Sequence, residues 1–430
     1  MEKDRLTLNM FQKWPAPIRQ YIDRLFSDSE ARKIITNIGW LSADRLIRMV
    51  FGICIGVFVA RYLGPNNFGL FNYAVAFISI FSIIASLGIE TITVRELVNH
   101  PDERETVLST VFGLKLIAGM LSFLVLITSS YLIHPGTAEV YLIIWVLSLT
   151  FLLQPFDTVD LWYQSNVEAK YGVYAKSSAF LITSAFKLLF IYLRVPLIGF
   201  VWLVFLETLI ASSGLIIGYI RSHISVNVKS FCRITATRLL KDGLPLMLSG
   251  ILITIYMKVD QIMLVKMINE KELGLYSVAV KLTEAWHFIP MAVVPSIFPN
   301  LISSKGESIS AFYSKLQILY DMMAVSAYAI ALPMMLMSGS IVQLLYGVEY
   351  TNAAPMLAIL IWSNLFVNLG VARSSFLTAM NYTKLYLMCI FIGCLINIVL
   401  NTILIPTYGG IGAANATDVA FDFAGYIYCL

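Results

Sequence analysis

The chain has 430 residues, of which 58% are hydrophobic and 13% are charged, and its formal net charge is +4. Ordinary soluble domains average about 45–50% apolar and about 25% charged residues, so the composition excludes a typical soluble enzyme. A membrane-spanning helix needs about 20 apolar residues, so there is room for about a dozen spans. We therefore predict an all-α integral membrane protein, and we expect no nucleic acid partner.

Residues 1–37 are predicted to form a basic cytoplasmic segment. Apolar residues recur at helical spacing after Pro17, with arginines between them, which is typical of an amphipathic helix on a membrane surface. An ordinary solvated helix fits the pattern equally well. The segment lacks the apolar core of a signal peptide.

Twelve apolar stretches follow. We place spans near 38–60, 70–94, 107–133, 139–162, 174–195, 196–220, 243–266, 274–300, 313–338, 353–372, 382–405 and 409–429. Such long runs indicate helices, because barrel strands are about 10 residues long with alternating faces. Asp418 and Asp422 make the last span the weakest. Most basic residues outside the spans fall on one side, which places the N-terminus in the cytoplasm.

A short phrase occurs twice. "LGPNNFGLFNYAVAF" (63–77) and "INEKELGLYSVAVKL" (268–282) align at a shift of 205 residues, after span 1 and after span 7. Chance similarity among small and apolar residues is one explanation, and duplication of a six-span unit is the one we favour. Duplication predicts an N-lobe over 38–220, a basic linker over 221–242 and a C-lobe over 243–430. A parallel repeat of this kind places substrate between the halves.

Several motifs resemble those of bacterial polysaccharide flippases, the Wzx-type or PST-type members of the MOP superfamily. The motifs are "ARYLGPNNFGLFNYAVAF", "IASLGIETITVREL", "VDLWYQSNVEAKY", "MKVDQIML" and "PTYGGIGAA", and the resemblance covers the chain from about residue 38. It implies two six-helix lobes, related by a pseudo-two-fold axis along the membrane normal, around a central cavity. It also implies movement of polyprenyl-diphosphate-linked oligosaccharides to the outer leaflet. The extension before residue 38 and the polar "ANATDVAFDF" depart from the family's pattern.

Cations inside the spans are candidates for binding the anionic head group, because charge inside a membrane is expensive. These candidates are Arg45, Arg48, Lys187, Lys258 and Lys281. Arg45 and Arg48 lie three residues apart on span 1 and can either bind diphosphate or extend to the surface. Lys115 is expected to extend to the surface.

Carboxylates and a histidine inside the spans are candidates for ion coupling. These are Glu207, Asp260, Glu284 and His287. A buried carboxylate can exchange a proton, and its oxygens can bind Na⁺. The structural alternatives are pairing of Glu207 or Asp260 with Lys187 or Lys258, and of Lys281 with Glu284.

We predict a flippase of the inner membrane that works by alternating access, with H⁺ or Na⁺ as coupling ion. A multidrug/cation antiporter of the same superfamily is the near alternative, although cations inside the spans favour anionic cargo. A membrane polysaccharide polymerase or glycosyltransferase is the alternative from another class, but the outside loops are short and contain no catalytic motif. We expect no metal site, no cofactor and no catalytic residue. Expected partners are membrane lipids and the polymerase and glycosyltransferases of the pathway.

Overall fold

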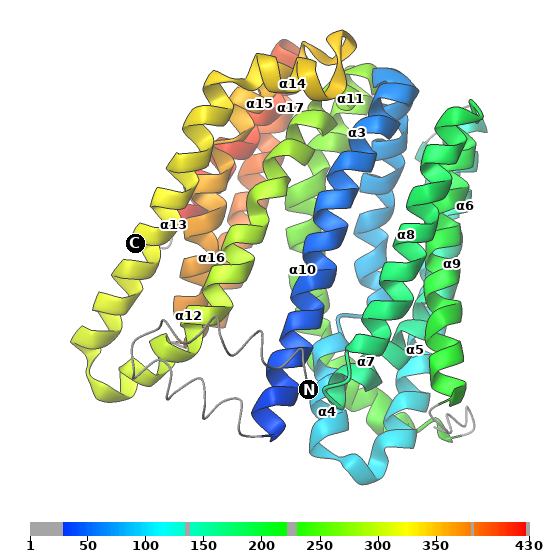
Figure 1. Ribbon diagram of the computed structural model, residues 1–430, viewed down its shortest axis with the longest axis vertical. Coiled ribbons are helices and arrows are strands. Elements are labelled where there is room, and N and C mark those ends of the chain that lie inside the picture. Colours follow the sequence, from blue (N-terminus) through cyan, green and yellow to red (C-terminus); the bar gives the residue numbers. More distant parts are fainter. Residues whose placement is uncertain (1–28, 134–137, 222–229, 380–381, 427–430) are drawn as a thin grey trace, which may run out of the picture.

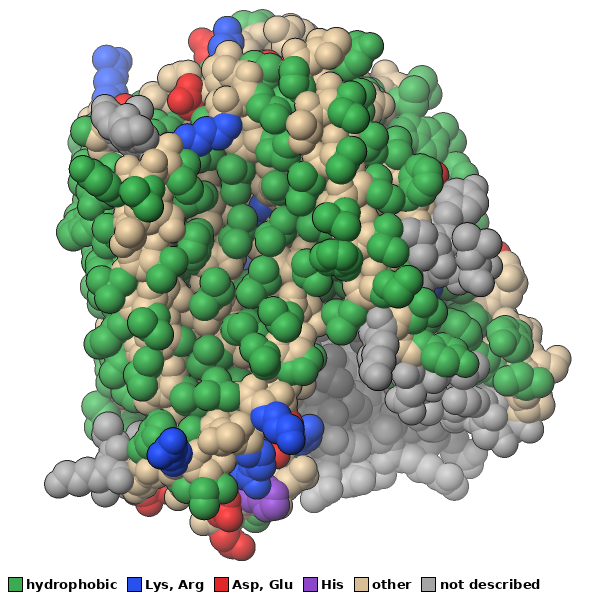
Figure 2. Space-filling view, turned by 180° about the vertical axis from the view of Figure 1, so that it is seen from behind, with side chains coloured by type: hydrophobic (Ala, Val, Ile, Leu, Met, Phe, Trp, Pro, Cys, Tyr) green, Lys and Arg blue, Asp and Glu red, His purple; other side chains and the backbone are tan. Residues whose placement is uncertain are grey.

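The computed structural model describes residues 29–133, 138–221, 230–379 and 382–426, and every regular element within these ranges is a helix. Nine of the described helical segments are long and apolar enough to cross a membrane. On the face seen in Figure 2, hydrophobic side chains cover most of the middle, and most charged side chains lie near the two ends. This distribution is that of a protein surrounded by lipid, as the composition predicts.

The N-lobe contains α3 to α9. Helix α3 bends sharply at Gly64, and Figure 1 shows its dark-blue arm rising and a lighter-blue arm returning beside it. The fourth pass is built from two α-helices joined by a 3₁₀ helix. The bounds are α3 Ser29–Ser86, α4 Glu90–Asn99, η1 Pro101–Glu103, α5 Arg104–Ile133, α6 Ala138–Ser148, η2 Leu149–Phe156, α7 Asp157–Ser165, α8 Lys170–Tyr192 and α9 Leu197–Arg221.

The C-lobe contains α10 to α17. Helix α17 bends at Gly409 as α3 does at Gly64. The bounds are α10 Arg233–Met267, α11 Glu270–Glu284, η4 Ala285–His287, α12 Phe288–Glu307, α13 Ile309–Leu336, α14 Ser338–Tyr346, η5 Val348–Tyr350, α15 Ala353–Leu360, α16 Ser363–Ala379 and α17 Thr383–Tyr426. The last ten residues of the predicted linker are thus the start of α10, and the predicted surface helix before residue 29 lies outside the described residues.

Two bent helices reconcile the nine long segments with the twelve predicted spans. Gly64 has φ 71° and Gly409 has φ 57°, a left-handed conformation that glycine adopts without strain. Counting each arm separately, and counting α11 with α12 as one pass, gives twelve passes within the described residues. The predicted fold class is therefore confirmed. We call the end with these bends the bend end, and the end where α9 leads towards α10 the linker end.

The two lobes are most tightly packed at the bend end. The largest hydrophobic core includes Ala60 and Phe68 of one lobe and Leu273, Tyr276 and Tyr350 of the other. The Tyr350 hydroxyl donates a hydrogen bond to the Ala60 carbonyl over 2.7 Å. The core of the molecule therefore extends across the boundary between the lobes.

Gly69 and Gly274 allow this packing. These residues occupy the same place in the two copies of the repeated phrase, since they are 205 positions apart. A methyl group on Gly274 would overlap the Pro65 carbonyl, and one on Gly69 would overlap the Glu270 carbonyl. The backbones of α3 and α11 therefore touch directly, as small residues permit between membrane helices.

At the linker end, contact between the lobes is made by the start of α10. Ala236 and Leu239 pack into a small N-lobe core that includes Leu97. Arg238 Nη2 lies 2.9 Å from Glu96 Oε2, and Arg95 Nη2 lies 2.7 Å from Asp242 Oδ2. Polar pairs therefore supplement a much smaller apolar contact at this end.

Replacing Gly274 with alanine is expected to separate the lobes at the bend end. The added methyl group meets a backbone carbonyl that no side-chain rotation can move, so the free energy of unfolding should fall by about 1–3 kcal/mol. The thermal unfolding midpoint of the purified protein measures this. Gly39→Ala is the matched control, because no atom lies within 4 Å of the place that its added methyl group would take. Equal midpoints for the two variants would contradict a tight glycine contact.

Candidate functional site

Two adjoining cavities lie between the lobes beside the Gly69–Gly274 contact. One, of about 160 Å³, is lined by residues that include Phe68, Lys187 and Lys281. The other, of about 240 Å³, lies between residues 71–79 of α3 and 277–284 of α11, which overlap the ends of the two copies of the repeated phrase. The cavities share Phe71 and Lys281. We call them together the interlobe cavity.

The C-lobe wall of the interlobe cavity contains two lysines and a glutamate. Lys258 Nζ lies 3.1 Å from Glu284 Oε1, and both side chains are half-buried. Lys281 instead places its ammonium group 4.5 Å from the centre of the Phe68 ring, in a cation–π contact. Within the described part of the chain, Lys281 forms no ion pair. The alternative pairing of Lys281 with Glu284 is therefore wrong, and Lys258 takes that place.

The N-lobe side has its own group of charges. Lys187 Nζ lies 3.4 Å from Glu207 Oε2, and the Thr183 hydroxyl donates a hydrogen bond of 3.0 Å to the same oxygen. Arg48 forms two ion pairs: its Nη1 lies 3.9 Å from Glu207 Oε1, and its Nε lies 2.9 Å from Asp44 Oδ1. Glu207 is therefore paired with Lys187, as the structural alternative expects.

The two span-1 arginines have different surroundings. The Arg48 guanidinium lies 5.4 Å from the ring of Phe180, which also lines the interlobe cavity. Arg45, three residues earlier on α3, is exposed. The structure therefore places Arg48 behind the cavity wall, in contact with the lining residue Phe180 and close to Glu207, and leaves Arg45 apart.

Asp260 is buried inside the C-lobe. It is 4% exposed and accepts hydrogen bonds from the Tyr276 hydroxyl and from the Gln261 amide, the latter at 2.7 Å. The hydroxyl of Thr417 lies 3.4 Å from the same carboxylate. Asp260 is thus held by hydroxyl groups and an amide, and the proposed pairing with Lys258 is not formed.

A small cavity of about 40 Å³ connects these polar groups. Its lining includes Asp260, Tyr276, Glu284, His287 and Thr417, and Glu284 also lines the interlobe cavity. His287 Nε2 is buried without a hydrogen-bond partner among the described atoms. Three of the four coupling candidates therefore lie around one space, whereas Glu207 lies in the other lobe.

Two residues of this group were not predicted from the sequence. Tyr276 stands where the first copy of the repeat has Phe71, so the added hydroxyl was the available signal. Thr417 precedes Asp418 in the last span, where only the carboxylates were considered. Within the described ranges, no three His, Cys, Asp or Glu side chains gather as a metal site would require.

Lys115, expected to extend to the surface, does not do so. Its side chain is 1% exposed and lies 3.6 Å from Glu90 Oε1. On α5 the Lys115 side chain points towards α4, so it is buried beside the Glu90 carboxylate and does not contact solvent. The expectation for Lys115 is therefore wrong.

Comparison with known proteins adds independent information. The family model described as "Polysaccharide biosynthesis protein" matches residues 34–305. A Shigella flexneri protein assigned as an O-antigen transporter is 23% identical over 398 residues, which are 89% of this chain and 93% of that protein.

Two solved structures share the fold. The lipid II flippase MurJ, in an inward closed conformation, has a TM-score of 0.72 and 15% identity, covering 90% of this chain and 86% of that one. An inward-facing multidrug resistance MATE family transporter of the MOP superfamily has a TM-score of 0.71 and 14% identity, covering 91% and 98%. At such identities the similarity establishes the arrangement of helices.

Replacing Glu207 with glutamine is expected to destabilise the N-lobe. The change leaves Lys187 and Arg48 half-buried without their shared carboxylate, so the free energy of unfolding should fall by about 1–2 kcal/mol. Thermal unfolding of the purified protein measures the loss, and adding Lys187→Gln should restore part of it. Glu105→Gln, at an exposed position, is the control. An unchanged midpoint for Glu207→Gln would show that the cluster adds nothing to stability.

Proposed function

Because the chain belongs to the polysaccharide biosynthesis protein family and has the fold of MOP-superfamily transporters, we propose that it is a flippase for lipid-linked oligosaccharides. Its cargo is a repeat unit joined through diphosphate to a polyprenyl carrier. It moves this cargo from the cytoplasmic to the outer leaflet of the inner membrane. The chain itself makes and breaks no covalent bond in this process.

The observation that carries the proposal is the charge of the interlobe cavity. Lys187, Lys258 and Lys281 line it from both lobes. Glu207 and Glu284 pair with the first two, so the charge of Lys281 is left over. Lys281 rests on an aromatic ring and has no carboxylate partner among the described residues. An anionic diphosphate would meet a surplus of positive charge here, whereas an organic cation would be repelled. This favours the flippase over the multidrug/cation antiporter.

Polar side chains between the lysines suit the sugar part of the cargo. Asn72, Ser79, Gln261 and Ser277 line the larger cavity. Amide and hydroxyl groups can both donate and accept hydrogen bonds, as sugar hydroxyls require. The carrier's hydrocarbon chain needs no such groups and can remain in an apolar environment.

Alternating access fits the unequal contacts between the lobes. We place the bend end outside and the linker end in the cytoplasm, because basic residues are concentrated near the linker end. In the described arrangement the backbones of the two lobes touch beside the cavity through the Gly69–Gly274 contact. Release to the outer leaflet would then require these backbones to part while α10 keeps its contacts with α4.

Coupling to an ion gradient is assigned to the C-lobe. Asp260 is a buried carboxylate with hydroxyl neighbours, and it adjoins the cavity through Glu284. Either a proton or Na⁺ could bind there, since oxygen ligands serve both. Polymerase and glycosyltransferases of the same pathway are the proposed protein partners, because they consume and supply such a lipid.

Replacing Lys281 with alanine should reduce polysaccharide export by about tenfold or more, the effect of losing one contact between a charged donor and the cargo. Export is measured in cells that lack the chromosomal copy, with membrane insertion checked by immunoblot. Lys281→Arg keeps the charge and should retain part of the activity. Lys271→Ala, at an exposed position of the same helix, is the control. Full export by Lys281→Ala would refute a role of this lysine in cargo binding.

Replacing Asp260 with asparagine should remove the dependence of transport on an ion gradient. An amide keeps the size of the side chain but can neither exchange a proton nor offer a charged ligand. Transport in reconstituted vesicles is measured with an imposed pH gradient and, separately, with a Na⁺ gradient. Asp321→Asn, exposed on α13, is the control. If the variant still responds to the gradient as the wild type does, coupling does not pass through Asp260.

A further inference from the structure

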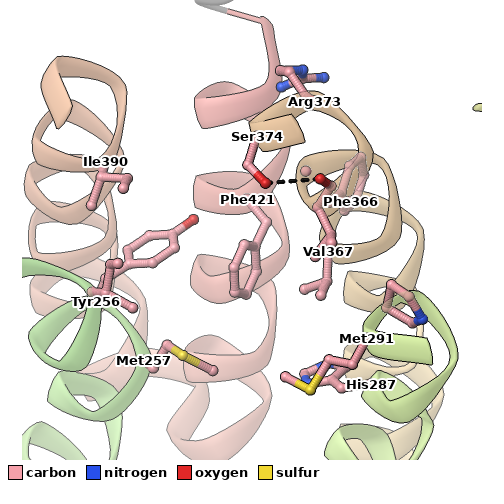
Figure 3. A pocket seen from close by; sticks show the side chains of 14 residues that line it. Tyr256, Met257, His287, Met291, Phe366, Val367, Arg373, Ser374, Ile390 and Phe421 are labelled. Carbon is pink, nitrogen blue, oxygen red and sulfur yellow. Dashed lines mark hydrogen bonds between the residues drawn. The ribbon is translucent and has the colours of Figure 1, made fainter. Parts of the chain in front are cut away.

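A separate pocket of about 280 Å³ lies within the C-lobe. Its lining comes from α10, α12, α16 and α17, as Figure 3 shows. Met257, Met291, Val367 and Phe421 form much of its wall. The cargo's sugars cannot use such a surface, so the pocket calls for a ligand that is largely apolar.

The pocket has a charged group at one end. In Figure 3 Arg373 lies beyond Ser374 at the top, while Met257, Met291 and His287 lie at the bottom. Helix α16 runs from the bend end towards the linker end, so Arg373 marks the end of the pocket nearer the linker end. A ligand that matches the pocket therefore has an apolar body among the methionines and an anionic group beside Arg373, facing the linker end.

We propose that this pocket binds the first isoprene units of the polyprenyl carrier as it enters from the cytoplasmic leaflet, with the phosphate beside Arg373, before the head group moves to the interlobe cavity. The inference rests on the proposed function, which supplies the carrier and places the linker end in the cytoplasm. A lipid in the cytoplasmic leaflet has its phosphate towards the cytoplasm and its chain towards the membrane midplane. The pocket has the same polarity, so the carrier can enter without reversing its orientation.

The lining is suited to a branched hydrocarbon chain. Two methionines contribute flexible, polarisable side chains, which adapt to irregular shapes. Gly370 also lines the pocket, and no atom lies within 4 Å of a methyl group placed on it. This open space beside α16 is where a methyl branch of an isoprene unit would lie.

Filling the pocket tests the proposal. Gly370→Leu places a side chain in the open space, and the apparent Kd for undecaprenyl phosphate should rise about tenfold, since displacing even two buried methylenes has this effect. Native mass spectrometry of the purified protein measures the binding. Gly339→Leu, on α14 with equally open surroundings, is the control and should bind as the wild type does. Equal affinity of Gly370→Leu and the wild type overturns the proposal.

The charged end is tested with a pair of ligands. Arg373→Gln should weaken binding of undecaprenyl phosphate about tenfold but leave binding of neutral undecaprenol unchanged, because only the phosphate needs the guanidinium. Phosphatidylglycerol is the competitor. If it displaces the carrier at equal concentration, the pocket is a general lipid site, and the assignment to the carrier is overturned.

Measuring transport as well as binding distinguishes a failure of this inference from a failure of the proposed function. If Gly370→Leu binds undecaprenyl phosphate poorly and flips the lipid-linked oligosaccharide slowly, both proposals are supported. Wild-type binding of undecaprenyl phosphate without any flipping would overturn the function and leave the pocket assignment standing. Normal flipping by Gly370→Leu would overturn the pocket's role and leave the function standing.

Discussion

The arrangement of the lobes depends on one backbone contact, that between Gly69 of α3 and Gly274 of α11. Neither position has room for a Cβ atom, because each faces a carbonyl of the other helix. Lipid gives apolar side chains little reason to associate, so membrane helices gain most from such close approach. With the backbones in contact, residues 71–79 and 277–284 must face each other, and the cavity between them follows.

The two copies of the repeat share a backbone geometry but differ in charge. Ala76 in the first copy corresponds to Lys281 in the second, and Phe71 corresponds to Tyr276. The changed positions belong to the candidate site. Lys281 supplies a charge that has no ion-pair partner among the described residues, and Tyr276 donates a hydrogen bond to Asp260. The paired glycines that pack α3 against α11 are thus alike in the two copies, whereas the residues at the positions of Lys281 and Tyr276 differ.

The helices could be predicted from the sequence because each membrane helix must satisfy its own backbone groups, which requires long apolar runs. The partners of the charges could not, because they depend on how each helix is rotated. Arg45 and Arg48 differ by three residues, yet one is exposed and the other lies beside Glu207. Glu284 is three residues from Lys281 but pairs with Lys258 of the neighbouring helix. Spacing along one helix says nothing about which neighbour is nearer.

The proposed roles of the two lobes also differ. In the N-lobe the charges compensate one another, with Glu207 between Lys187 and Arg48, which favours a fixed structure. In the C-lobe, His287 lines both the small cavity around Asp260 and the apolar pocket below Arg373. A ligand in that pocket would lie next to the carboxylate proposed to bind the coupling ion. Carrier recognition and ion coupling would then act on the same group of C-lobe helices, against a comparatively rigid N-lobe.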